Sequence, residues 1–300
     1  MASVVTEVDG RSLTLSNLDK VLYPATGTTK AEVIAYYAAI APVMARHTSG
    51  RCITFRRFPD GVDGSSFFEK RCPSHRPDWV PVAVGPGDRR GIVEYCRLEE
   101  TAAFVWAANL AALELHAPMA RCEDLDAPLM VVFDLDPGEG TGVAECARVA
   151  LDLRDICQAV GLEMWAKTSG SKGMQCYVPL NSAHTHEHCS DFAHAAGRLL
   201  AQRRPTGVLT TMGKKDRVGK VFVDWSQNSR HKTTICAYSL RARPEPTVSC
   251  PVDWDEVAAA TEGAPMRFTS DEVLDRVQAR GDLFAPTVDL VQHLPVAKSG

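Results

Sequence analysis

Residues 129–140 read LMVVFDLDPGEG, in which five apolar residues lead into two aspartates one residue apart, followed by Pro137 and Gly138. An apolar run ended by such a turn signal is typical of a buried strand. Alternate side chains of a strand share a face, about 6.5–7 Å apart, so we expect Asp134 and Asp136 to point the same way. Two unpaired buried carboxylates repel each other. The stretch therefore predicts either a strand end with two solvated aspartates or a divalent-cation site with hard oxygen ligands.

A third carboxylate follows another apolar strand, in residues 220–226 (KVFVDWS), where Asp224 comes at the strand end. The alternative is a single aspartate before a turn. Three carboxylates delivered by two strands can hold two metal ions about 3.5–4 Å apart, which activate one oxygen and stabilise the leaving one in a displacement at phosphorus. We therefore expect Asp134, Asp136 and Asp224 to be catalytic metal ligands for two Mn²⁺ or Mg²⁺ ions.

The elements around these strands predict an α+β fold with mixed, partly antiparallel sheets flanked by helices. Several strands are joined by turns too short for crossover helices, which disfavours a doubly wound parallel sheet. Helices are expected over residues 29–50, 101–118, 141–161, 190–205 and 269–282. Strands are expected over residues 52–58, 66–72, 79–84, 91–96, 129–136, 163–169, 174–180, 220–226 and 234–240. We predict one domain over residues 1–300, with a core of about 12–285 and a loosely held tail at 286–300.

Composition sets wide limits on the class of protein. The chain has 300 residues, 45% of them hydrophobic, and a net charge of −4, as expected of a soluble globular protein. It contains no apolar run long enough for a membrane span and no signal-peptide pattern at its start, and its ten cysteines form no CxxC pair. These features predict reduced thiols and a cytoplasmic location. Residues 203–243 are locally basic, which indicates either a solvated face or a site for phosphates.

A glycine-rich stretch joins two of the predicted strands, in residues 167–180 (KTSGSKGMQCYVPL). Glycines let a backbone approach an anion closely, and hydroxyls and a lysine add donors. The spacing is not that of a Walker A loop, and a hairpin turn is the alternative. Beside a metal site, the loop predicts a binding site for a triphosphate. Lys232, Arg241 and Arg243 would supply further cations. Arg241 and Arg243 fall on one face of a predicted strand, and the alternative is that this face is solvated. His116 is expected at the end of a buried helix, and residues 184–189 (HTHEHC) as a polar loop before the next helix.

Taken together, FDLDPG, TSGSKG, KVFVDWSQN and YSLRAR, in this order, resemble the polymerase domain of bacterial DNA ligase D, a member of the archaeo-eukaryotic primase superfamily. LSNLDKVLYPATGTTK, RFPDGV and FFEK in the N-terminal part are also similar, so the resemblance covers roughly residues 12–285. It implies a primase-like core and a template-dependent nucleotidyltransferase that fills gaps or break ends in DNA repair, with Mn²⁺ favoured and ribonucleotides preferred.

The resemblance also implies roles for individual residues. It implies that Asp134, Asp136 and Asp224 are the metal ligands. The implied nucleotide-binding residues are His116, Ser169, Ser171, Lys172, Gln227, Lys232, Arg241 and Arg56. The implied DNA-binding residues are Lys20 and Lys30, on the 5′-phosphate of a gap, together with Phe67, Phe68 and Lys70. The implied partners are gapped or broken DNA, ribo- or deoxyribonucleoside triphosphates, and, as candidates, Ku and a DNA ligase, in the bacterial cytoplasm at the nucleoid.

Departures from the family pattern and rival functions stay open at this point. Arg56 stands where ligase-linked members often carry lysine, and the chain has no KxDG nucleophile motif. A stand-alone gap-filling relative and a ligase-linked domain are both compatible with this. A two-metal phosphodiesterase or nuclease would use the same aspartates, and a catalytically silent DNA-end binder would use the basic surfaces alone. Without the resemblance, residues 65–72 (SSFFEKRC) predict a strand with one buried phenylalanine.

Overall fold

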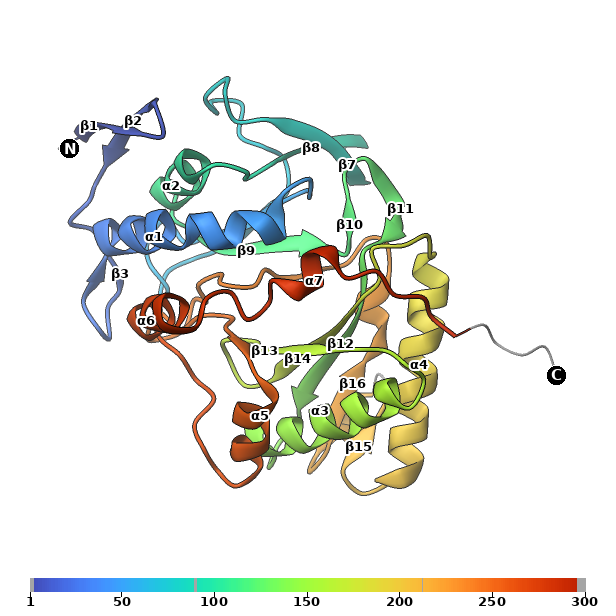
Figure 1. Cartoon of the computed structure of the whole chain (residues 1–300). Coiled ribbons are helices and arrows are strands. Elements are labelled where there is room, and N and C mark those ends of the chain that lie inside the picture. Colours follow the sequence, from blue (N-terminus) through green and yellow to red (C-terminus); the bar gives the residue numbers. More distant parts are fainter. Residues whose placement is uncertain (1–2, 89–90, 212, 296–300) are drawn as a thin grey trace. The chain divides into compact units, whose positions relative to one another are not determined.

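The computed structural model describes residues 3–88, 91–211 and 213–295 (Figure 1). The chain divides into two compact units. Unit 1 consists of Met1–Pro118, Thr233–Cys250 and Phe268–Asp282, and unit 2 of Met119–Lys232, Pro251–Arg267 and Leu283–Gly300. The chain thus enters each unit more than once, and the single domain predicted over residues 1–300 stays a prediction.

Unit 2 is built on a six-stranded sheet whose order is β15-β16-β12-β14-β13-β18. Every neighbouring pair is antiparallel except β15 with β16, which is parallel. The mixed, partly antiparallel α+β class predicted from the sequence is confirmed. The strands are β12 (Met130–Pro137), β13 (Trp165–Thr168), β14 (Met174–Pro179), β15 (Val208–Leu209), β16 (Val221–Asp224) and β18 (Pro251–Val252).

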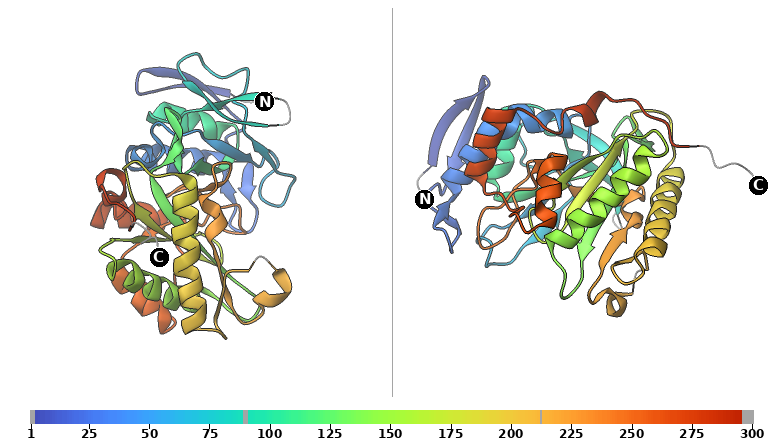
Figure 2. Two further views of the ribbon diagram at one scale, coloured as in Figure 1. Left: turned by 90° about the vertical axis from the view of Figure 1, so that its right-hand side faces the viewer. Right: turned by 60° about the horizontal axis from the view of Figure 1, so that its bottom comes forward.

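Helices α3 (Val143–Gln158) and α4 (His186–Arg203) contact each other and pack against β12 (Figures 1 and 2). Phe133 and Leu135 of β12 are completely buried, as expected of apolar strand residues covered by helices. Helix α5 (Trp254–Thr261) packs in turn on α3. The sheet therefore carries its apolar side chains toward these helices, and the alternate residues of β12 lie on its other face.

The remaining elements of unit 2 are short. They are β10 (Ala120–Arg121), β11 (Asp124–Pro128), the 3₁₀ helices η1 (Lys214–Arg217) and η2 (Trp225–Asn228), and α7 (Pro286–Asp289). After α7, Gln292 Nε2 donates hydrogen bonds to the carbonyl oxygens of Pro179 and Glu163, at 2.8 and 3.0 Å. Residues 286–295 of the predicted loose tail are thus tied to the sheet, and 296–300 lie outside the described residues.

Unit 1 packs α1 (Lys30–Thr48) on α2 (Thr101–Asn109) and holds a four-stranded sheet in the order β17-β9-β5-β6. Capping boxes form at two helix starts in this unit: the Thr29 backbone N–H donates to Glu32, and that of Thr269 to Glu272. These contacts satisfy backbone groups that a helix start leaves without partners. The sheet strands are β5 (Thr54–Arg57), β6 (Phe67–Glu69), β9 (Ala112–Pro118) and β17 (Thr233–Ile235). The unit also contains helix α6 (Ser270–Arg280). Three hairpins complete it: β1 (Ser3–Val8) with β2 (Arg11–Ser16), β3 (Val21–Tyr23) with β4 (Thr28–Thr29), and β7 (Val82–Asp88) with β8 (Gly91–Cys96).

Three sequence-based predictions of elements are wrong. The helix predicted over residues 101–118 ends at Asn109, because Ala111 has a φ of 56° in the left-handed region and residues 112–118 form β9. His116 therefore lies on a strand. The polar loop predicted at 184–189 is helical from His186, with Thr185 as N-cap. The strand predicted over 234–240 stops at Ile235, before a turn in which Tyr238 has a φ of 68°.

The cysteines follow the prediction only in part. Cys72 and Cys96 are joined by a disulfide, with their Cα atoms 4.9 Å apart, which contradicts the expectation that all thiols are reduced. Of the other eight cysteines, seven are buried.

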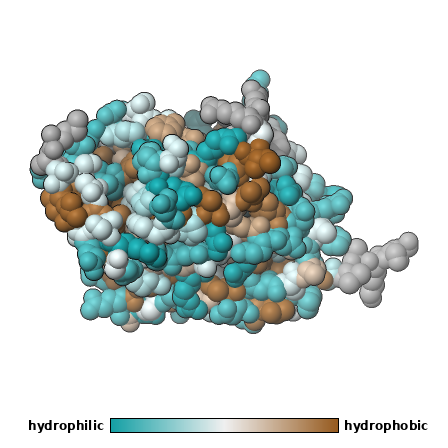
Figure 3. Space-filling view, turned by 90° about the horizontal axis from the view of Figure 1, so that it is seen from above, coloured by the Kyte–Doolittle hydropathy of each residue, from teal (hydrophilic) through white to brown (hydrophobic). Residues whose placement is uncertain are grey.

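The surface carries hydrophobic residues in separate patches. On the face shown in Figure 3, these patches are set in a mostly hydrophilic surface. The exposed large hydrophobic residues include Val5, Val84 and Ile92. Among the described residues, no helix combines the length and the apolar character that crossing a membrane would need.

Candidate functional site

The three predicted aspartates are brought together in unit 2. Asp134 of β12 is the register partner of Asp224 on β16, and Asp136 is the partner of Phe222. Leu135 between the two aspartates is fully buried, while Asp134 is half-buried and Asp136 exposed. Asp134 and Asp136 therefore lie on the same face of the sheet, as the strand periodicity predicts, with Asp224 beside them.

The pKa values of two of these carboxylates indicate negative charge that the surrounding protein does not compensate. Burial, together with the nearby charges of Asp136 and Asp224, raises the pKa of Asp134 to about 7. Burial and the Asp224 charge also raise the pKa of Asp136, against the effect of Arg217, whose Nη1 lies 3.9 Å from its Oδ2. A divalent cation would relieve this repulsion, so the chemistry of the donor set fits one. Within the described ranges, no three acidic, histidine or cysteine side chains already surround one point as metal ligands.

Asp224 has local hydrogen-bond partners that fix it at the end of β16. Its Oδ1 accepts from the backbone N–H and the Oγ of Ser226, at 3.0 and 2.6 Å. Its Oδ2 faces Gln227 Nε2 at 3.4 Å and Lys232 Nζ at 3.7 Å. Two predicted nucleotide-binding residues, Gln227 and Lys232, thus contact a predicted metal ligand directly.

The glycine-rich loop between β13 and β14 lies against the aspartate strand. A Cβ placed on Gly173 would come within 2.2 Å of the Leu135 carbonyl oxygen, so only glycine permits this approach. Ser169 Oγ accepts hydrogen bonds from the backbone N–H groups of Ser171 and Gly173, at 3.2 and 3.1 Å. The Ser169 hydroxyl therefore closes the turn, while Ser171 is half-buried and Lys172 exposed.

Two polar residues that the sequence analysis did not select complete the aspartate surroundings. Gln175 Nε2 donates to Asp134 Oδ1 at 3.1 Å, and Lys167 Nζ donates to Gln175 Oε1 at 2.5 Å. Lys167 is 1% exposed. A buried lysine in an apolar strand is the sequence signal that could have found this pair, because an uncompensated buried charge is rare.

In unit 1, the buried Glu114 of β9 gathers several predicted site residues. Its carboxylate accepts from Arg241 Nε at 3.1 Å and from Arg56 Nη1 at 3.4 Å, and His116 Nε2 lies 3.1 Å from Oε2. Burial alone would raise the pKa of Glu114, but the His116 hydrogen bond and the Arg241 charge hold it well below its ordinary value. Burial lowers the pKa of His116, against the opposing effect of Glu114. The alternation LELH in residues 113–116 is a strand signal that could have located Glu114.

An exposed aromatic strand lies next to this cluster. Phe67 and Phe68 of β6 are 45% and 58% exposed, so the prediction of one buried phenylalanine is wrong. The Arg56 guanidinium lies over the Phe68 ring at 5.4 Å, and the Phe68 and His116 rings meet edge to face at 5.6 Å. Lys70, one residue after the strand, is exposed. Exposed rings beside cations are suited to stacking nucleic-acid bases.

The two predicted phosphate-binding lysines are neighbours at the start of α1. The Lys30 backbone N–H donates to the Lys20 carbonyl at 2.8 Å. Lys20 is exposed and pairs with Asp60 at 2.9 Å, whereas Lys30 is 5% exposed and donates to the Ser16 carbonyl at 2.6 Å. Burial, and then the charges of Lys20 and Arg57, lower the pKa of Lys30 to about 8.

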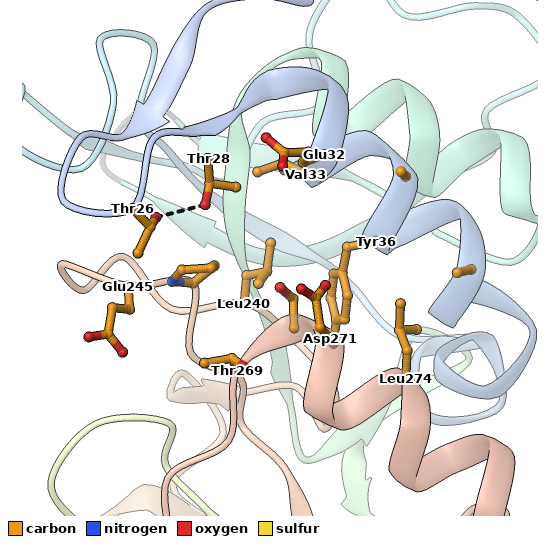
Figure 4. Close-up of a pocket in the computed structure, with 14 residues that line it drawn as sticks. Thr26, Thr28, Glu32, Val33, Tyr36, Leu240, Glu245, Thr269, Asp271 and Leu274 are labelled. Carbon is orange, nitrogen blue, oxygen red and sulfur yellow. Dashed lines mark hydrogen bonds between the residues drawn. The ribbon is translucent and has the colours of Figure 1, made fainter.

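A cavity of about 600 Å³ in unit 1 contains none of the predicted site residues (Figure 4). It lies between α1 and α6, and Tyr36 and Leu274 contribute apolar walls. Its charged lining residues are the carboxylates Glu32, Glu245 and Asp271. Such a lining does not suit phosphate or nucleic acid, so this cavity is not the candidate active site.

Comparison with known proteins identifies the family. The family model described as "LigD, primase-polymerase domain" matches residues 29–284. The chain belongs to the LigD primase-polymerase domain family. The predicted family is thereby confirmed, and with it the enzyme class, a nucleotidyltransferase of the polymerase type.

Individual relatives of this LigD-type chain agree. The multifunctional non-homologous end joining protein LigD of Mycolicibacterium smegmatis is 45% identical over 274 residues, which are 91% of this chain and 35% of the relative. The bifunctional LigD of Bacillus subtilis is 30% identical, over 90% of this chain and 43% of its own length. This chain thus spans about a third to two fifths of these relatives.

A solved structure matches almost end to end. It is the polymerase domain of Mycobacterium tuberculosis ligase D in complex with DNA, which is 41% identical with a TM-score of 0.86. The match covers 92% of this chain and 98% of the solved one. The primase-like polymerase fold expected from the resemblance is confirmed.

Proposed function

We propose that this chain is a template-dependent nucleotidyltransferase that fills short gaps or break ends in DNA during non-homologous end joining, with ribonucleotides as preferred substrates. Membership in the LigD primase-polymerase family supports the polymerase reaction. A solved relative that is a polymerase domain in complex with DNA supports DNA as the substrate. The names of the curated relatives support end joining as the setting.

The observation that carries the proposal is the group of three carboxylates on one face of the unit 2 sheet. Burial and the charges of Asp136 and Asp224 raise the pKa of Asp134, and burial and the Asp224 charge raise the pKa of Asp136. We propose that they hold two Mn²⁺ or Mg²⁺ ions. When bound, such ions would supply charge neutralisation for an attacking 3′-hydroxyl and a leaving pyrophosphate.

Cationic and hydroxyl side chains in each unit support a triphosphate as the second substrate. In unit 2, Ser171 and Lys172 extend from a loop that glycine holds against β12. We propose that they bind phosphate, and that Ser169 shapes the loop while Gln227 and Lys232 orient Asp224. In unit 1, we propose nucleotide contacts for His116, Arg56 and Arg241, which Glu114 holds in place.

The rival functions use fewer of these features. A two-metal nuclease would need the aspartates but gives no role to Lys172 or to the Glu114 cluster. A silent DNA-end binder would need the exposed cations and rings but not three like charges side by side. For the DNA contacts we propose Lys20 and Lys30 on a 5′-phosphate, with Phe67, Phe68 and Lys70 along the adjoining bases.

The test is nucleotide incorporation on a gapped template with a 5′-phosphate, in the presence of Mn²⁺ or Mg²⁺. The wild-type chain should extend the primer, a nuclease would shorten it, and a silent binder would leave it unchanged. Asp134→Ala and Asp136→Ala should abolish extension and leave DNA binding largely intact, because each removes a balancing charge and not a DNA contact. Asp155→Ala, which removes an exposed carboxylate on α3, is the matched control and should extend normally. Wild-type extension by either site variant would contradict the assignment.

The setting in the cell is also a proposal. We propose that the chain works in the bacterial cytoplasm at the nucleoid, together with Ku and a DNA ligase activity. Pull-down of this chain by Ku on broken DNA, with undamaged circular DNA as the control, would test the partnership independently of catalysis.

A further inference from the structure

Four polar side chains form a row across the unit 2 sheet. In the strand register, Lys167 of β13 is opposite Gln175 of β14, Gln175 is opposite Asp134 of β12, and Asp134 is opposite Asp224 of β16. Register partners on neighbouring strands present their side chains on the same face. The row therefore runs from a buried lysine to the carboxylates of the candidate metal site.

The contacts in this row fix the orientation of the Gln175 amide. Its Oε1 accepts from Lys167 Nζ at 2.5 Å and from Tyr177 Oη at 3.0 Å. An ammonium group has no lone pair and can only donate, so the amide oxygen must face Lys167. The amide nitrogen is thereby directed toward Asp134, to whose Oδ1 it donates at 3.1 Å.

The surroundings of Lys167 keep its ammonium group next to the Gln175 amide. It is 1% exposed, and its Nζ also lies over the Tyr177 ring, 5.5 Å from the centroid. The Tyr177 ring in turn meets Phe284 edge to face at 5.4 Å. Lys167 is therefore confined on one side by packed rings and engaged on the other by Gln175.

The row leaves one oxygen of Asp134 available. Asp134 Oδ1 is occupied by Gln175, whereas no described residue donates a hydrogen bond to Oδ2. We propose that Lys167 and Gln175 are positioning residues, which hold Asp134 so that Oδ2 is presented to a divalent cation. This inference rests on the proposed function, because it needs Asp134 to be a metal ligand.

The roles of the two residues are coupled. Without the positive charge, the Gln175 amide oxygen keeps the Tyr177 hydroxyl as a donor but loses its charged donor, so the amide nitrogen is directed toward Asp134 less firmly. Outer partners of metal ligands typically change metal affinity by about 10- to 100-fold when they are removed. Lys167 Nζ donates its hydrogen bond to Gln175 Oε1, so its effect on the orientation of Asp134 should pass through Gln175.

The experiment is Mn²⁺ binding to the protein without nucleotide or DNA, followed by the electron paramagnetic resonance signal of free Mn²⁺. Lys167→Met should weaken Mn²⁺ binding about 10-fold or more. Lys167→Met leaves Gln175 Oε1 with the Tyr177 hydroxyl as a donor, so the unfolding temperature should change little. A purely structural role would show the opposite pattern, with a lower unfolding temperature and unchanged Mn²⁺ affinity.

A double-mutant cycle makes the test specific. Gln175→Met should weaken Mn²⁺ binding, and adding Lys167→Met to it should cause no further loss, because the two residues act as one unit. The double variant removes both hydrogen-bonding partners and so leaves neither one buried alone, which keeps the test available if a single variant fails to fold. Wild-type Mn²⁺ affinity in the folded double variant, or additive losses in the cycle, would overturn the proposal.

Asp134→Ala separates this inference from the proposed function. If Asp134→Ala loses Mn²⁺ binding and the double variant does not, Asp134 is a ligand and the positioning role is wrong. If Asp134→Ala binds Mn²⁺ as the wild type does, the metal assignment itself is wrong. Tyr177→Phe is the matched control, since it removes the second donor to Gln175 Oε1 and keeps Lys167; it should cost less than Lys167→Met.

Discussion

Recognition of a 5′-phosphate should weaken as the pH rises through about 8, because Lys30 then loses its charge. Burial and the neighbouring charges of Lys20 and Arg57 lower the pKa of Lys30 to about 8. A phosphate monoester has its second pKa near 6, so the DNA phosphate stays doubly charged across this range. Lys30 Nζ donates one hydrogen bond to the Ser16 carbonyl, and an ammonium has two further donors for an anion.

The size of the effect follows from the charged fraction of Lys30. With a pKa of about 8, that fraction falls from about nine tenths at pH 7 to about one tenth at pH 9. If the phosphate binds the charged form, its contribution to affinity should fall about tenfold, or about 1.4 kcal/mol.

In the free protein, the charge of Lys30 affects folding stability in the opposite direction, because it is unfavourable there. The folded pKa of Lys30 is lowered, so keeping Lys30 charged costs stability below pH 8. This cost should be relieved as the pH rises from about 8 toward the ordinary value of 10.5.

The assay is fluorescence anisotropy of a gapped DNA with and without its 5′-phosphate, between pH 6.5 and 9.5 at constant ionic strength. The ratio of the two affinities isolates the phosphate from all other contacts. Lys30→Arg is the control, because arginine keeps its charge throughout this range, and its ratio should stay level. Lys20→Ala/Lys30→Ala should lose the preference at every pH. A wild-type ratio that does not change with pH would refute the reasoning, as would an equal decline in Lys30→Arg.

Three further outcomes are expected. Lys172→Ala and Arg241→Ala should each weaken apparent nucleotide affinity about 10- to 100-fold, since each removes a charge-assisted hydrogen bond to phosphate. Unchanged affinity in both variants would mean that the glycine-rich loop carrying Lys172 is only a structural turn. Glu114→Gln should destabilise the protein by about 3 kcal/mol in urea unfolding at pH 7, at the lower end of the range for a buried pair, because it leaves the half-buried Arg56 and Arg241 without their carboxylate. This difference should shrink as the pH falls below the ordinary glutamate pKa of 4.5. Cys72→Ser, which opens the disulfide to Cys96, should lower the unfolding temperature under oxidising conditions and have no effect in excess dithiothreitol.

Patterns confined to one strand or one helix were the ones that the sequence predicted well. The strand before Asp134 and the helix start near Thr29 depend on neighbours within a few residues, and both are confirmed. The segment 101–118 failed because its alanine-rich composition favours helix, whereas pairing with β5 and β17 makes residues 112–118 a strand. Pairing with neighbouring strands outweighed the local helix propensity, and the alternation LELH was the sequence pattern that indicated a strand.

The residues that were missed share one property, which is that each has partners in other segments of the chain. Glu114 is explained by cations far along the chain, and Gln175 by Lys167 and Asp134, which neighbouring strands place beside it. No spacing in the sequence encodes such a row, because strand order and register decide which residues become partners. A buried charge inside an apolar strand is nevertheless visible beforehand, and it carries a physical demand: something must neutralise it or accept from it. Lys167 meets that demand through the Gln175 amide, which donates to Asp134 of the proposed metal site, so the burial of one charge is coupled to the orientation of another.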